Sequence, residues 1–274
     1  MDYQDRFLRA ATEQGVPRDE AARYAELVLR FRIRAGAGPD GVRAGRFGGL
    51  PHLPADIAWP CIRPGVPLPY LAAVDCAALP RIAGFALPAG GSLLFFLSPE
   101  AAMSSRSVPE EQQFARVVHV PAGTVTAPTG PPDDDCDDEP LTGPEHDLYA
   151  RVEPDLPDWL NQSPEFLTDL EKQLTRDIPG MAQLNAVVDR LWPGRVPWIE
   201  DDLLLGGYSV SAQNSPESIL ADDSSEEAVL RGWVALAQFA VPHEEYVNGR
   251  FLIRHQDLVA GRFDKALSFC EFTE

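Results

Sequence analysis

The chain has 274 residues, of which 45% are hydrophobic and 9% aromatic, so it can bury a sizeable core as one large domain or two small ones. Its net charge is −19, from 42 acidic and 23 basic residues. A field of that sign serves solubility, repels nucleic acid and anionic membranes, and attracts basic partners. We therefore expect neither a nucleic-acid partner nor a membrane partner.

The N-terminus lacks the basic and then apolar layout of a secretion signal, and no stretch approaches the ~18 apolar residues that a membrane helix needs. The four cysteines are far apart and form no C-x-x-C pair, which favours reduced thiols over a disulfide framework. These features predict a soluble, cytoplasmic protein. The cysteines are Cys61, Cys76, Cys136 and Cys270.

The N-terminal region predicts two helices, over residues 2–14 and 18–34. Gly15-Val16-Pro17 separates them, because proline removes a backbone donor and glycine ends the preceding turn. Apolar residues recur at helical spacing in the second helix, and glycine and proline follow it at 36–39.

Residues 41–125 form a first β-rich half, with strands predicted near 69–76, 91–97 and 114–120. The stretch 48–60 is expected to be a rigid, extended loop, because its prolines cannot donate a hydrogen bond to a helix or a central strand.

Residues 126–147 predict a solvated acidic loop, because six carboxylates crowded into seven positions cannot pack together. A calcium loop is the sharper alternative, but the glycine and closing glutamate of an EF-hand are both missing. The carboxylates are Asp133, Asp134, Asp135, Asp137, Asp138 and Glu139.

Residues 155–192 predict a helical insertion, because Ser163-Pro164 supplies a cap followed by proline at the first helical position. A second β-half follows at 203–272. It contains a short helix near 225–231 and strands at 233–240, 250–255 and 266–272.

The two β-halves share one order of features: a di-glycine, an apolar strand, another glycine and a further strand. In the first half these are Gly48-Gly49, residues 71–75 and Gly91; in the second they are Gly206-Gly207, residues 236–239 and Gly249. The repeat predicts an α+β fold in which antiparallel sheets from two related halves form one domain over 1–274, with N-terminal helices at 1–36.

Catalytic and metal motifs are absent from the sequence. It has no G-x-S-x-G elbow, no Walker loop, no G-x-G-x-x-G after a strand and no complete H-E-x-x-H. No cofactor or metal is therefore predicted, although folding could still assemble a site from distant histidines. Cys61 or Cys76 with His52 stays open as a nucleophile pair, and a small core residue is the commoner role for such a cysteine.

Some residues of the repeat invite a functional interpretation beside a structural one. Trp59 could be a stacking platform or cover the core. Asp75 and Asp257 could cap turns or pair with Arg254. Gln213 and Gln238 could hold the two halves together, because a buried amide must satisfy its polar atoms. The candidate ligand-binding residues are His52, Asp56, Trp59, Asp75, Gln213, Gln238, Arg254 and Asp257.

These segments, in this order over about residues 41–265, resemble the bacterial YwqG-like family, which is classified as a domain of unknown function. The blocks that carry the resemblance are Gly48-Gly49-Leu50-Pro51-His52-Leu53-Pro54, Trp59-Pro60, Leu71-Ala72-Ala73-Val74-Asp75, Gly91-Ser92-Leu93-Leu94-Phe95-Phe96, Leu205-Gly206-Gly207-Tyr208 and Gly249-Arg250-Phe251-Leu252-Ile253-Arg254.

The resemblance implies an α+β fold with antiparallel sheets and brings no catalytic residues. Ala73 stands where the family tends to have glutamine, and Ser209 where it often has proline. Some genes of the family lie near contact-dependent toxin systems, which implies an immunity or antitoxin-like role by association.

We expect a non-enzymatic module that binds a basic protein through the acidic run Asp133 to Glu139. The alternative is a hydrolase-like enzyme that binds a small ligand at the 48–60 loop, in a pocket lined by His52, Asp56, Trp59 and Asp75. A third alternative is a structural or regulatory module with an exposed apolar patch at 155–192.

Overall fold

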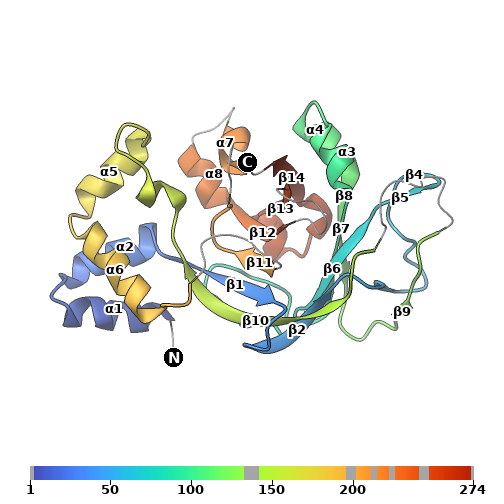
Figure 1. Ribbon diagram of the computed structural model, residues 1–274, viewed down its shortest axis with the longest axis horizontal. Coiled ribbons are helices and arrows are strands. Elements are labelled where there is room, and N and C mark those ends of the chain that lie inside the picture. Colours follow the sequence, from blue (N-terminus) through green and yellow to red (C-terminus); the bar gives the residue numbers. More distant parts are fainter. Residues whose placement is uncertain are drawn as a thin grey trace. The chain divides into compact units, whose positions relative to one another are not determined.

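The computed structural model describes residues 3–132, 142–195, 202–210, 215–221, 226–240 and 247–272. The chain divides into two compact units (Figure 1). The helical unit comprises Met1–Arg32 and Glu153–Trp198, and the β unit comprises Ile33–Val152 and Ile199–Glu274. The N-terminal helices and the helical insertion, 120 positions apart in the sequence, thus belong to one body.

The helical unit is built from α1 (Tyr3–Glu13), α2 (Arg18–Leu27), the 3₁₀ turn η2 (Asp158–Asn161), α5 (Asp169–Asp177) and α6 (Met181–Leu191). Its core contains Phe7 of α1, Tyr24 of α2 and Leu184 of α6. The Tyr24 hydroxyl donates to Asn185 Oδ1 at 2.6 Å, and Glu20 accepts from the Gly180 N–H. The predicted N-terminal helical hairpin is confirmed, and these contacts join it to the insertion.

The predicted helix over 18–34 is wrong beyond Leu27, because residues 30–36 form a strand, β1 (Arg30–Gly36). Arg32 is fully buried on β1 and bonds Glu153 Oε1 at 2.8 Å and Asp155 Oδ1 at 3.1 Å. Arg30, Arg32 and Arg34 alternate along the chain, which is the two-residue period of a strand and not the spacing of a helix face.

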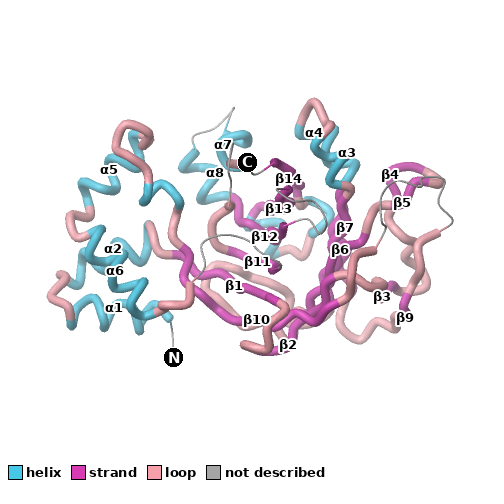
Figure 2. The backbone as a smooth tube through the Cα atoms, in the orientation of Figure 1, coloured by secondary structure: helices cyan, strands magenta, loops and turns pink. Residues whose placement is uncertain are grey.

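Within the described residues, ten strands form one sheet, in the order β14-β13-β12-β11-β1-β10-β2-β6-β7-β8 (Figure 2). Besides β1 the bounds are β2 (Val42–Phe47), β6 (Tyr70–Asp75), β7 (Ser92–Leu97), β8 (Ala115–Val120), β10 (His146–Asp155), β11 (Asp202–Gly206), β12 (Trp233–Ala240), β13 (Val247–Arg254) and β14 (Leu267–Phe272). Two short hairpins lie apart from it: β3 (His52–Leu53) with β9 (Ala127–Pro128), and β4 (Cys61–Arg63) with β5 (Val66–Pro67).

The sheet contains the two related halves, which flank β1 and β10. The strand order β2-β6-β7-β8 on one side mirrors β11-β12-β13-β14 on the other. Both di-glycines have left-handed backbones, with φ of 63° and 67° at Gly48 and Gly49 and of 77° and 78° at Gly206 and Gly207. Only glycine adopts such a pair of angles without strain.

A bulge at matching places supports the same equivalence. The register of β6 shifts between Tyr70 and Ala72, and that of β12 between Ala235 and Ala237. One residue after each bulge stand Ala73 and Gln238. The α+β fold with related antiparallel halves is therefore confirmed.

The second glycine of the predicted repeat is not equivalent in the two halves. Gly91 precedes β7 and has φ of 89°, whereas Gly249 lies inside β13, opposite Phe239. A Cβ at Gly249 would lie 2.7 Å from the Phe239 ring and 2.9 Å from Leu97 Cδ2. The first glycine makes a turn, and the second gives room to packed side chains.

The two halves pack against each other through one apolar core. The Phe95 and Phe251 rings have their centroids 5.5 Å apart, and Phe47 and Phe239 meet edge to face at 6.5 Å. Each half also sends a short segment across to the other. The helices α3 (Pro99–Met103) and α4 (Val108–Glu111) contact β14, and the 3₁₀ turn η4 (Phe263–Lys265) contacts β8.

The sequence missed α3 and α4, and also α9 (His255–Val259), where it predicted only the end of a strand. It also missed β10, which begins in the region predicted as an acidic loop. These helices span four or five residues, too few for a 3.6-residue period to be recognised in sequence.

Candidate functional site

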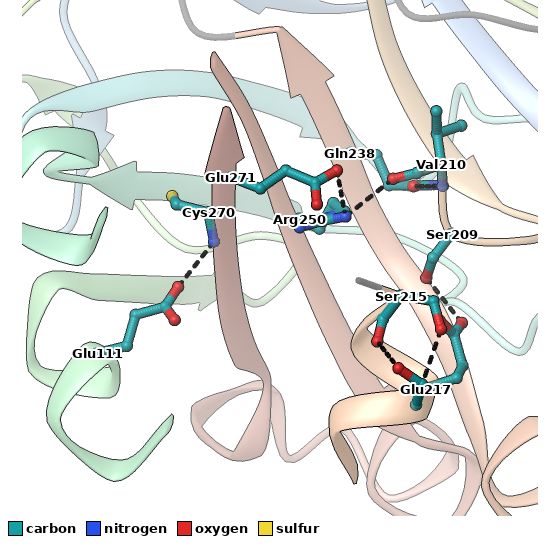
Figure 3. Close-up of polar contacts among 10 residues, drawn as sticks. Glu111, Ser209, Val210, Ser215, Glu217, Gln238, Arg250, Cys270 and Glu271 are labelled. Carbon is teal, nitrogen blue, oxygen red and sulfur yellow. Dashed lines mark hydrogen bonds and ion pairs between the residues drawn. The ribbon is translucent and has the colours of Figure 1, made fainter. Parts of the chain in front are cut away.

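Polar side chains gather on the outer face of the second half. Phe239 and Phe251 point into the core, so their neighbours Gln238 and Arg250 point to the opposite face, because side chains alternate along a strand. Gln238 and Arg250 are direct partners across β12 and β13. Both are almost completely buried, and Glu271 of β14 lies beside Arg250 (Figure 3).

The segment 208–210, which we call the strap, follows the second di-glycine and lies against these side chains. Gln238 Oε1 accepts from the Val210 N–H at 2.7 Å, and Gln238 Nε2 donates to the Tyr208 carbonyl at 2.8 Å. Arg250 Nη1 donates to the Val210 carbonyl at 3.0 Å. The strap therefore satisfies both polar ends of the Gln238 amide, as a buried amide requires. Both contacts are made to the second half itself, whereas the sequence prediction had Gln238 joining the two halves.

Arg250 and Glu271 form a buried ion pair, with Arg250 Nη1 2.8 Å from Glu271 Oε1. Within the described residues, Arg250 Nε has no hydrogen-bond partner. Removing two charges from water costs several kcal/mol each, and their attraction offsets this only where geometry and further hydrogen bonds are good. Arg250 obtains its further bond from the strap.

A second carboxylate holds the strap at its other side. Glu217 is buried on α7 (Pro216–Leu220), and Ser209 Oγ donates to Glu217 Oε1 at 2.7 Å. Ser215 caps this helix by accepting from the Ser218 N–H at 3.0 Å. Ser209 is thus a hydroxyl bonded to a buried carboxylate, and three side chains from different elements hold the strap's three residues.

Within residues 41–125, all of which the structure describes, the first half has no polar counterpart of this arrangement. Ala73 and Leu94 are the strand pair that matches Gln238 and Arg250 relative to the bulge. Around them lies an apolar cluster that includes Leu53, Trp59 and Phe96. The two halves therefore share a backbone plan and differ in chemistry on the outer face. This contrast makes the second half the candidate site.

The chain matches the family model described as "Domain of unknown function (DUF1963)" over residues 45–271. That range covers more than half of the chain and includes strands of both β-halves. The chain belongs to this family. Comparison with curated proteins gives no match. The family match thus encloses the strap, Gln238, Arg250 and Glu271, and it brings no activity with it.

The four residues expected to line a pocket at the 48–60 loop have different surroundings. His52 and Asp56 are exposed. Trp59 is buried, donates from Nε1 to the Leu68 carbonyl at 2.8 Å and meets the Phe96 ring edge to face at 5.6 Å. Asp75 is exposed, and its Oδ1 accepts from the Ala77 N–H at 2.9 Å. Trp59 thus has the core-covering role and Asp75 the turn-capping role that the sequence offered.

Arg254 and Asp257 take no part in the strap's contacts. Arg254 is exposed and lies over the Trp233 ring, 4.7 Å from its centroid. Asp257 is buried and pairs with Arg262, not with Arg254, at 2.5 Å. Gln213 and the acidic run from Asp133 to Glu139 lie outside the described residues.

A search of the described residues finds no group of three or more histidine, cysteine or acidic side chains placed to hold a metal ion. In the same part of the chain, no helix has the length and apolar character to cross a membrane.

Sequence patterns did not identify Arg250, Glu271 and Glu217 as site residues, and they marked Ser209 only as a departure from the family. A signal for two of them exists: Arg250 follows Gly249 and precedes Phe251, and Glu271 stands between Cys270 and Phe272. A lone charge inside an apolar strand is rarely buried unless it is paired. The pairing itself joins strands that periodicity cannot place side by side.

Proposed function

We propose that the protein is a non-enzymatic binding module of the bacterial cytoplasm that recognises a basic protein partner. The YwqG-like resemblance supports a bacterial origin and an immunity-like or regulatory role. The net charge of −19 supports the sign of the partner, because such a field steers positively charged proteins toward it.

The observation that carries the proposal is how the candidate site uses its polar atoms. Gln238 gives both its carbonyl and its amino group to the strap backbone, and Arg250 shares Nη1 between the Val210 carbonyl and Glu271. A group that binds or transforms a substrate presents its polar atoms to that substrate. Here they hold a surface segment in one conformation, which is the preorganisation that a binding surface needs.

The test starts with capture of partners from the native cell by the purified full chain. The association rate of a captured partner is then measured at several salt concentrations. Replacing the acidic run with serine should slow association and flatten its salt dependence, because steering fades as the field is screened.

A matched variant keeps the total charge change and moves it elsewhere. It replaces six exposed carboxylates with serine: Glu13, Glu26, Asp40, Glu100, Glu165 and Asp177. A larger effect of the acidic run than of this variant supports local recognition. If the association rate is the same at every salt concentration and in both variants, the electrostatic proposal is wrong.

A further inference from the structure

The outer edge of β14 is occupied by side chains. Among the described strands β14 is the last on its side of the sheet, so within that part of the chain one row of its backbone groups has no neighbouring strand. Gln112 Oε1 accepts from the Ser268 N–H at 2.7 Å, and Gln112 Nε2 donates to the Ser268 carbonyl at 3.1 Å. A carboxamide carries the same donor and acceptor as a peptide group, so Gln112 takes the place of a neighbouring strand at this residue.

Glu111 extends the same seal by two residues. Its Oε1 accepts from the Cys270 N–H at 2.9 Å (Figure 3). Ser268 and Cys270 are two apart, so their N–H groups point to the same edge of β14. Both sealing side chains come from one short segment, α4 (Val108–Glu111) and the 3₁₀ turn η1 (Gln112–Phe114).

This segment belongs to the first half and β14 to the second. The reciprocal crossing, η4 on β8, is of a different kind: Phe263 packs against the His119 ring with centroids 5.1 Å apart. An apolar contact of that kind does not respond to the charge of a carboxylate. The β14 edge is therefore where the ionisation of a carboxylate can act on the seam between the halves.

Glu111 is held where its charged form is disfavoured. Burial raises the pKa of Glu111 from 4.5 to about 7, against the opposite effects of the Cys270 N–H, Arg250 and Ser268. Arg250 is already paired with Glu271 of β14. The other carboxylates nearby in sequence or on the packed helix α3 are Glu110 and Glu100, both exposed, and Glu110 accepts from the Arg106 N–H.

We propose that residues 108–114 form a latch that is closed over β14 while Glu111 is protonated and opens when Glu111 ionises and moves into water. Opening would present the backbone of Ser268 and Cys270 to an added strand, which is a known way for proteins to bind extended peptides.

The direction of the pH dependence follows from the difference between the pKa of Glu111 in the open latch and its pKa in the closed latch. In the open state the Glu111 carboxyl has its ordinary value of 4.5, and in the closed state it titrates near 7. Closure is therefore fully favoured below 4.5, and its advantage falls as pH rises to 7. Because opening releases one proton, the equilibrium constant for opening rises by about tenfold for each pH unit between 4.5 and 7.

The test is backbone amide hydrogen exchange of the full chain at pH 5, 6, 7 and 8, expressed as protection factors so that the chemistry of exchange itself is divided out. We expect the protection of the Cys270 amide to fall by at least about tenfold from pH 5 to pH 8. Glu111→Gln keeps an acceptor oxygen and removes the titration, so protection should stay high and flat. Glu110→Gln, with the same change of charge on an exposed neighbour, should keep the wild-type slope.

Two further measurements complete the test. Gln112→Ala should lower the protection of the Ser268 amide at every pH, because it removes both of the bonds that replace a strand. The pKa of Glu111 can also be measured in the wild-type protein, by following the NMR signal of its carboxyl carbon as pH changes. This measurement tests the latch even where a variant does not fold. A protection factor of the Cys270 amide that is equal at pH 5 and pH 8 would show that the latch proposal is wrong. A Glu111 pKa at its ordinary value of 4.5 would show the same. The latch does not depend on the proposed basic partner.

Discussion

Gln238 and Arg250 face each other across β12 and β13 and hold the same residue, Val210, from its two sides. Gln238 accepts from the Val210 N–H at 2.7 Å, and Arg250 donates to the Val210 carbonyl at 3.0 Å. One strap residue is thus fixed by an amide and a guanidinium that are themselves cross-strand partners.

Replacing Gln238 with alanine should destabilise the protein by about 2–3 kcal/mol, because it removes two buried hydrogen bonds, those to the Val210 N–H and to the Tyr208 carbonyl. Urea unfolding measures the change. Gln173→Ala, at an exposed position of α5, is the control and should have little effect. Equal stability of the two variants would show that the strap is not held through Gln238.

Breaking the Arg250–Glu271 pair from one side should cost about 3–5 kcal/mol, because the buried Glu271 carboxylate would lose the guanidinium that faces it. The variant is Arg250→Met, which keeps much of the side-chain volume. The double variant with Glu271→Leu should recover part of the loss, since neither charge of the pair remains. A double variant less stable than either single variant would contradict this account. Arg43→Ala, in an exposed pair with Asp147, should have little effect.

Acidification should weaken the contact between η4 and β8. Burial lowers the pKa of His119 below its ordinary 6.5, although a bond to the Gly90 backbone opposes the shift. The folded state therefore favours the neutral ring, so its contribution to stability is present above pH 6.5 and is lost as pH falls through the lowered value.

The measurement for His119 is the difference in Tm between wild type and His119→Gln at pH 7.5 and at pH 5.5. A matched difference is needed because Glu111 acts in the opposite direction, favouring the folded state at acidic pH. We expect the advantage of the wild type to shrink at pH 5.5. An advantage that grows on acidification would show that His119 gains a partner on protonation.

Local sequence patterns predicted the strands of both halves well. The apolar run of β7 and the glycine pair at Gly206-Gly207 are short-range signals, and the structure has a strand and a left-handed turn at these places. β1 was missed because Arg32 looks exposed until Glu153, 121 positions away, is placed beside it. The equivalence of Gly91 and Gly249 failed for a related reason, since strand register is set by the bulges and not by glycine spacing.

At the candidate site, the sequence identified Gln238 as a residue whose buried amide needs partners, but it could not identify those partners. The strap, Arg250 and Glu271 come from three separate stretches of the second half. Their meeting depends on the pairing of β12, β13 and β14, which only the fold determines. A side chain that bonds the backbone of a distant segment needs no particular residue type there, so no local sequence motif identifies the contact.

The seal on β14 also has a consequence for how the chain folds. Gln112 is 156 positions from Ser268, and Glu111 is 159 positions from Cys270. Contacts between such distant positions carry a high loop-closure entropy and slow the folding reaction. We expect this seam to be among the later contacts to form, and molecules that still lack it offer a bare strand edge through which two chains can aggregate.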